Sequence, residues 1–198
     1  MNFCNRAGET QAVVEFVCMA YNDPLPPPAV SGERTFVGAR PWQSERPRIL
    51  IVACSDGRYQ QSLDEFLTEH LGILHYDRLY APGGPGSLAS STLSYFRGEQ
   101  FRQEAAFLMD AHGLESILFI FHGPVIEGGP IEATCADYRR KMPGSDAKEI
   151  YTRQEADLQE AVRAVMKVSR DIQISAYRAE VRRDLRVQFV PLKINKPD

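Results

Sequence analysis

Three side chains that can do chemistry follow one short apolar run in this sequence. The run covers residues 49–53, and after it come the thiol of Cys54, the carboxylate of Asp56 and the guanidinium of Arg58. A second apolar run ends at the imidazole of His122. A thiolate and an imidazole are donors that zinc prefers, and three protein donors with one open position make a catalytic zinc site. Cys54 and His122 are therefore candidate zinc ligands.

The two apolar runs are typical of strands that bring these side chains together. Residues 49–53 are too short for a helix and rich in β-branched side chains, which predicts a strand buried on both faces. Residues 116–121 have the same character and lead directly to His122. In open α/β sheets, ligands collect beyond the carboxyl ends of the strands. We therefore expect the thiol of Cys54 and the imidazole of His122 to face one crevice.

The remaining elements alternate between strand and helix patterns. In chain order the sequence predicts a strand at 49–53, a helix at 62–72, a strand at 73–81, a helix at 91–111, a strand at 116–121, a short helix at 131–141, a helix at 146–169, and alternating strands from 172 to 189 that turn near Arg183 and Asp184. This order predicts an α/β fold with a mainly parallel central sheet flanked by helices and a C-terminal antiparallel edge hairpin.

The N-terminal quarter differs in composition from the rest. Residues 9–21 have the apolar spacing of a helix, and residues 22–46 carry five prolines, which exclude regular helix. We expect residues 1–45 to form an N-terminal helix and a Pro-rich arm, and residues 46–198 to form the α/β domain. The arm is a candidate for contact with a neighbouring subunit.

The composition excludes several classes of protein. The chain of 198 residues has a net charge of −3 with scattered basic residues, which does not favour a nucleic-acid partner. No stretch approaches the roughly 20 apolar residues of a membrane span, and the first residues lack the apolar core of a signal peptide. We expect a cytoplasmic location, a small-molecule partner and no nucleic-acid or membrane partner. The four cysteines, Cys4, Cys18, Cys54 and Cys135, lack paired spacing and are expected to be reduced.

Between about residues 45 and 192 the chain resembles the β-class carbonic anhydrases. That family carries Cys-x-Asp-x-Arg after a buried strand and His-x-x-Cys after a later one. Here the first half is intact in Cys54, Asp56 and Arg58. The resemblance implies a β-carbonic-anhydrase-like fold, zinc held by Cys54 and His122, a dyad of Asp56 and Arg58 beside the metal, CO2 or bicarbonate as the small molecule, and a homodimer or higher homo-oligomer.

The second half of the family motif is broken. Three residues after His122 stands Val125, where the family has a thiolate, and valine cannot donate to a metal. Glu127 is the nearest replacement donor. Cys135 is another, but it falls on the following predicted helix and requires the loop to fold back. Asp56 could also bind, at the cost of its role in the dyad. We therefore expect an incomplete zinc site.

Several functions are compatible with this sequence, which leaves enzyme activity open. The first is a weak or inactive relative of CO2 hydratases. The second is an active zinc-dependent carbonic anhydrase, a lyase that converts CO2 and water to bicarbonate with a substitute third ligand. The third is a non-catalytic anion-binding or assembly subunit. The fourth is thiol chemistry, with Cys54 as nucleophile and Arg58 as anion clamp; phosphatase-type loops place five residues between these two, and only three intervene.

Two further features have structural interpretations. The run Pro82–Ser87 is rich in glycine and precedes a helix, but it lacks the lysine of a P-loop, so we expect a tight turn that lets the backbone approach the site. His70, His75 and His112 lie in or beside the stripes of predicted elements and are expected to be structural.

Overall fold

The computed structural model describes residues 37–39, 41–90 and 95–195. The chain divides into two compact units, Met1–Trp42 and Gln43–Asp198, and all the elements below belong to the second unit. The predicted helix at 9–21 and most of the Pro-rich arm lie outside the described residues. The division into 1–45 and 46–198 therefore stays a prediction.

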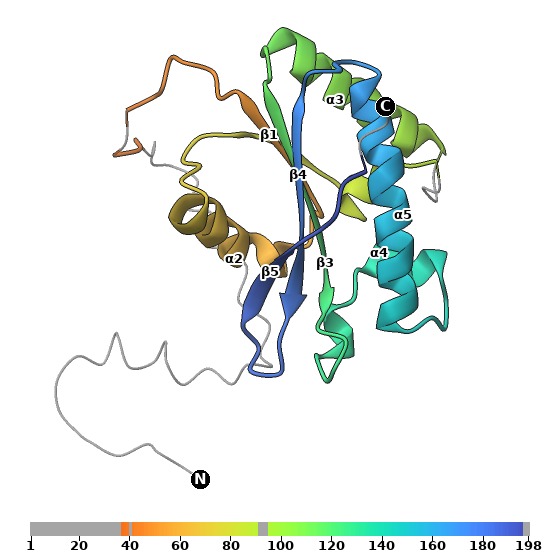
Figure 1. Ribbon diagram of the computed structural model, residues 1–198. Helices are drawn as coiled ribbons and strands as arrows, with labels where there is room; N and C mark the ends of the chain where they lie inside the picture. Colours follow the sequence, from red (N-terminus) through yellow and green to blue (C-terminus); the bar gives the residue numbers. More distant parts are fainter. Residues whose placement is uncertain (1–36, 40, 91–94, 196–198) are drawn as a thin grey trace, which may run out of the picture. The chain divides into compact units, whose positions relative to one another are not determined.

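The second unit is built on a five-stranded sheet (Figure 1) with the strand order β2-β1-β3-β4-β5. The strands are β1 Ile49–Ala53, β2 Asp77–Tyr80, β3 Ser116–Pro124, β4 Gln173–Val181 and β5 Val187–Pro191. The pairs β1–β2, β1–β3 and β3–β4 are parallel, and the β4–β5 edge hairpin is antiparallel. This topology confirms the predicted α/β class with a mainly parallel sheet and a C-terminal antiparallel hairpin.

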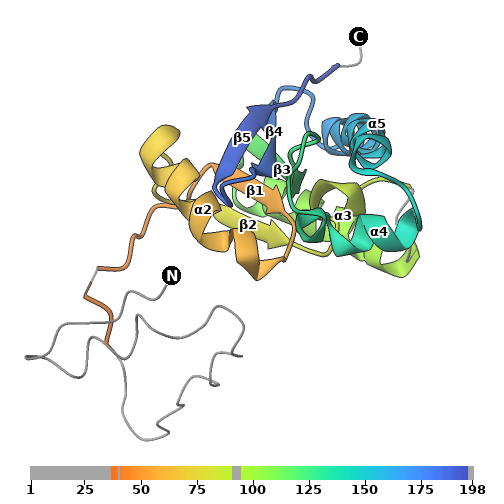
Figure 2. The same cartoon turned by 90° about the horizontal axis from the view of Figure 1, so that it is seen from below.

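Helices cover both faces of the sheet (Figure 2). They are α2 Gln60–Glu65, which continues as a π-helical turn at Phe66–His70, α3 Tyr95–Ala111, α4 Ala136–Lys141 and α5 Ala147–Met166. Helix α2 lies against one face, and α3, α4 and α5 lie against the other. In the part of the chain that the structure describes, no helix is both long and apolar enough to cross a membrane.

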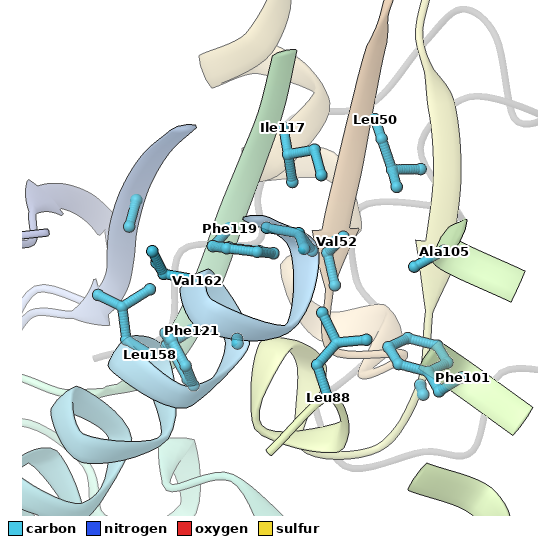
Figure 3. Close-up of a cluster of buried hydrophobic side chains, with 14 of the residues drawn as sticks. Leu50, Val52, Leu88, Phe101, Ala105, Ile117, Phe119, Phe121, Leu158 and Val162 are labelled. Atoms are coloured by element: carbon cyan, nitrogen blue, oxygen red, sulfur yellow. The ribbon is translucent and has the colours of Figure 1, made fainter. Parts of the chain in front are cut away.

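The core explains why β1 is apolar throughout. Leu50 and Val52 pack in the larger cluster, with side chains from α3 and α5 (Figure 3). Ile51 and Ala53 point to the opposite face and pack with Leu63 of α2, because successive side chains of a strand alternate between its faces. All four strand residues are at most 2% exposed. The strand is thus buried on both faces, as predicted.

Some boundaries differ from the sequence prediction. Strand β3 continues three residues beyond the predicted end at 121, because its ladder with β4 runs on to the pair Pro124 and Val181. Strand β2 is shorter than the predicted 73–81. The predicted short helix at 131–141 is two elements, a 3-10 turn at Ile131–Ala133 and helix α4. His122 consequently lies inside a strand, and Cys135 lies just before a helix.

Candidate metal centre

Cys54 is the first residue after β1, at the carboxyl edge of the sheet. The turn after β2 closes on it, since the amide of Ser55 donates to the carbonyl of Ala81 at 3.2 Å and the amide of Gly84 donates to the same oxygen at 2.8 Å. Gly84 has a φ of +55°, and a Cβ there would lie 2.8 Å from the amide nitrogen of Cys54. The glycine-rich run is therefore the tight turn that the sequence predicts, and only glycine fits at this point.

His122 presents an unused nitrogen. Its ring is 3% exposed, and its Nδ1 lies 3.2 Å from the carbonyl oxygen of Ala133. A carbonyl can only accept, so Nδ1 carries the proton and Nε2 keeps its lone pair. Nε2 is buried and has no hydrogen-bond partner among the described residues. Metal-binding histidines have this arrangement, in which one ring nitrogen donates to a carbonyl and the other faces the metal.

Cys135 is brought to the same place by the loop that follows β3. It precedes α4 and is 2% exposed, and its Sγ lies 4.0 Å from Sγ of Cys54. The candidate ligand atoms of Cys54, His122 and Cys135 all lie within 4.8 Å of one another. The loop folds back because the amide of Gly129 donates to the carbonyl of Val125 at 3.1 Å, which closes a turn.

The distance between the two sulfurs fits a shared metal. Both cysteines are free, and a disulfide needs a separation of about 2.05 Å. Two sulfurs each about 2.3 Å from one tetrahedral zinc lie about 3.8 Å apart, close to the 4.0 Å between Cys54 and Cys135. Two thiols and one imidazole are donors that suit zinc. The residues present therefore fit this metal.

The surroundings of the two thiols shift their pKa values in opposite directions. The hydrogen bond from Cys54 lowers the pKa of Cys135 well below its usual range, and contact with His122 acts in the same direction. The same hydrogen bond and burial raise the pKa of Cys54, while backbone amides of Asp56 and Gly83 donate to its sulfur and oppose that rise.

Asp56 and Arg58 form the predicted ion pair beside Cys54. Arg58 Nε lies 2.9 Å from Oδ1 of Asp56, and Nη2 lies 2.6 Å from Oδ2. Hydrogen bonding from Arg58 lowers the pKa of Asp56 below its ordinary value. The remaining guanidinium nitrogen, Nη1, donates to the carbonyl of Glu132 at 3.1 Å. Asp56 is thus held as an oriented carboxylate at the edge of the cluster.

The structure brings Cys54 and His122 together, as the sequence predicts, and of the replacement donors considered above it places Cys135 beside them. Glu127 is exposed in the turn after β3, and its backbone carbonyl accepts a hydrogen bond from Arg183 Nε at 2.9 Å. It is not in the group of candidate ligands, and Cys135 is. The structure thus places Cys135 near Cys54 and His122, and the set of zinc ligands stays a prediction.

A sequence signal for Cys135 did exist. Twelve residues separate it from His122, whereas the family motif has two, but it is the only cysteine that follows His122. The pair Gly128 and Gly129 lets the intervening loop turn back: Gly128 has a φ of +81°, and a Cβ on Gly129 would lie 2.6 Å from the amide of Val125. A motif of fixed spacing does not find a donor that arrives on a longer loop.

Comparison with known proteins gives a likeness of fold. No family model and no curated protein matches the chain. Among solved structures, β-carbonic anhydrase isoform I from the protozoan Trichomonas vaginalis matches over 78% of this chain and 88% of its own, at 15% identity and a TM-score of 0.42.

Two further solved structures match this chain with comparable TM-scores. The carbonic anhydrase from Streptococcus mutans matches over 74% of this chain and 82% of its own, at 17% identity and a TM-score of 0.40. An apo form of carbon disulfide hydrolase matches over 73% of this chain and 78% of its own, at 13% identity and a TM-score of 0.41. Each is a likeness of fold at low sequence identity.

Proposed function

We propose that this chain holds zinc through Cys54, His122 and Cys135 and adds water to CO2 or a similarly small electrophile. The observation that carries the proposal is the convergence of three donors around the buried, unpartnered Nε2 of His122. The intact Cys-x-Asp-x-Arg motif, with its resemblance to β-class carbonic anhydrases, supports the reaction class. This proposal replaces the incomplete site with a complete set of three protein donors.

The chain's own residues have defined parts in this proposal. When bound, zinc supplies Lewis acidity, which lowers the pKa of a water molecule and provides a nucleophile near neutral pH. Asp56 accepts a hydrogen bond from the attacking oxygen. This bond keeps a lone pair of that oxygen directed at the substrate. Arg58 holds Asp56 ionised, so the carboxylate accepts rather than donates. Ala133 holds the proton of His122 on Nδ1, which leaves Nε2 available.

The resemblance supplies the proposal for assembly, and the expected location rests on the sequence pattern described above. We infer a homodimer or higher homo-oligomer in the cytoplasm. Sedimentation of the purified chain distinguishes a dimer from a monomer, and fractionation of the native source decides the compartment.

Metal content and activity measured on matched variants test the proposed function. We expect about one zinc per chain in the wild type and less than about 0.2 in Cys135→Ser, because structural and catalytic zinc sites need at least three protein donors. Glu127→Gln is the matched control and should keep the wild-type zinc content. Stopped-flow assays should show CO2 hydration above buffer for the wild type and for Glu127→Gln.

The outcomes separate the candidate functions. Equal zinc content in Cys135→Ser and the wild type would overturn the ligand set. A full complement of zinc without hydration would instead favour the non-catalytic anion-binding relative.

A further inference from the structure

The position of Cys135 needs a physical explanation, because its loop has ten residues more than the family motif between the histidine and the second cysteine. A longer loop has more conformations to lose when its end is held in place. The four residues before α4, Glu132–Cys135, are here called the return segment. Whatever fixes the return segment also sets where the sulfur of Cys135 lies relative to Cys54.

Successive carbonyls of the return segment are held by the turn that follows Cys54. The carbonyl of Glu132 accepts from Arg58 Nη1 at 3.1 Å. The next carbonyl, of Ala133, accepts from the hydroxyl of Tyr59 at 2.8 Å and faces Nδ1 of His122 at 3.2 Å. A carbonyl oxygen has two lone pairs, and Ala133 uses both. Arg58, Tyr59 and His122 thus hold two consecutive peptide units in place.

Tyr59 is placed to make this contact rigid. It is 7% exposed and ends the 3-10 turn Gly57–Tyr59, which Asp56 caps. Its ring lies 4.3 Å from the ring of His122, with an angle of 46° between the planes. Burial raises the pKa of Tyr59, so its hydroxyl remains a donor. The ring position and the hydrogen bond together leave the Ala133 carbonyl little freedom.

We propose that Tyr59 is a positioning residue for the zinc ligand Cys135, acting through the carbonyl of Ala133. The hydroxyl joins the turn after Cys54 to the residue two places before Cys135, so it constrains the separation of the two sulfurs. Tyr59 donates to no ligand atom of the cluster. This inference rests on the proposed zinc site, but it concerns the geometry of the metal-free chain as well.

Zinc affinity of a matched pair of tyrosine variants tests the role. Tyr59→Phe keeps the ring against His122 and removes only the hydroxyl. We expect its zinc affinity, measured by competition with a chelator, to fall by about tenfold, the effect usual for loss of a group that orients a metal ligand. Tyr76→Phe is the control, because its hydroxyl is also a hydrogen-bond donor, but to Asp64 Oδ1 at 2.5 Å, which is not in the group of candidate ligands. It should keep zinc affinity within about twofold.

A second measurement needs no metal and no catalysis. A trivalent arsenical binds two nearby thiols, so its affinity for the metal-free chain, with Cys4→Ser and Cys18→Ser in the background, reports the separation of Cys54 and Cys135. Tyr59→Phe should weaken arsenical binding, and Tyr76→Phe should not.

Zinc affinity and arsenical affinity are compared in both tyrosine variants. Equal zinc and arsenical affinity in Tyr59→Phe and the wild type would overturn the inference, and so would equal losses in both tyrosine variants, which would indicate a general effect on stability. If the wild type binds no zinc while the arsenical still distinguishes the two variants, the proposed function fails and the positioning role of Tyr59 stands.

Discussion

The sulfurs of Cys54 and Cys135 lie 4.0 Å apart, although the two residues are 81 positions apart in the chain. Cys54 directly follows a buried strand. Cys135 lies at the end of a loop whose backbone carbonyls accept hydrogen bonds from other parts of the chain. The donor set therefore depends on two pieces of local structure that are far apart in the chain and joined by hydrogen bonds from Arg58 and Tyr59.

The glycine turn after β2 should be intolerant of any side chain at Gly84. Gly72 has a similar φ of +69° with nothing within 4 Å of where a Cβ would stand, whereas a Cβ on Gly84 would also lie 3.1 Å from the carbonyl oxygen of Ile120. We expect Gly72→Ala to lower the free energy of unfolding by about 1 kcal/mol. Gly84→Ala should cost about 3 kcal/mol or more, because it adds a clash to the same backbone strain. Urea unfolding of both variants measures the difference, and equal losses would contradict the close approach to Cys54.

Restoring the family's cysteine should not improve the site. Val125 donates its amide to the carbonyl of Val181 at 2.9 Å and is not in the group of candidate ligands. Since Cys135 is the third donor of the proposed site, Val125→Cys should leave zinc content at about one per chain. The same change in a Cys135→Ser background should not restore zinc. Restored zinc content in that background would mean that the loop after β3 can bring either thiol to the metal.

The carboxylate of Asp56 should matter for turnover and not for metal binding. Asp56→Asn keeps the shape and loses the charge, so we expect the hydration kcat to fall by about 100-fold, the usual scale for a general acid–base group. Zinc content should be unchanged. Glu132→Gln is a suitable control, because Glu132 meets Arg58 through its backbone carbonyl and not through its carboxylate. A loss of zinc in Asp56→Asn would indicate that Asp56 is itself a ligand.

A buried ion cluster behind α4 should contribute strongly to stability. Asp157 is 0% exposed; it accepts from the hydroxyl of Tyr138 at 2.7 Å and pairs with Arg153 Nη2 at 2.9 Å. Asp157→Asn removes a buried negative charge that faces the buried amine of Lys141 at 4.0 Å, so we expect a loss of about 3 kcal/mol in the free energy of unfolding.

The exposed pair of Arg182 and Asp184, 3.4 Å apart in the hairpin turn, provides the comparison for Asp157. Asp184→Asn should cost less than about 1 kcal/mol, because solvent screens exposed ion pairs. Chemical denaturation of the two variants under the same conditions checks the contrast. Similar losses in the two variants would show that the charge of Asp157 contributes no more to stability than the charge of an exposed ion pair.

Local pattern is sufficient to predict most of the fold. The unbroken apolar runs of β1 and β3 specify strands buried on both faces, and α5 begins where Asp146 and Glu149 form a capping box, with the Glu149 amide 2.8 Å from Oδ1 of Asp146. The hairpin turns at the predicted place, between two runs of alternating apolar residues that form β4 and β5. Strand ends are less predictable, since the length of β3 is set by its ladder with β4, a contact that the sequence of β3 alone does not contain.

The candidate site is predictable only as far as its residues follow strands directly. Cys54 is positioned by the strand before it, and His122 lies in the strand that pairs with it, so both can be placed from local pattern. Cys135 is positioned by hydrogen bonds from Arg58 and Tyr59, residues more than seventy positions away. Long-range contacts of this kind leave no periodic signal, which is why the sequence favours Glu127, the nearer donor.

Zinc K-edge absorption spectroscopy of the purified chain tests the central claim most directly. The account predicts two sulfur scatterers at about 2.3 Å and one imidazole nitrogen at about 2.0 Å around a single zinc, with one sulfur lost in Cys135→Ser. A chain purified without zinc, or a wild-type spectrum with fewer than two sulfurs, would contradict it.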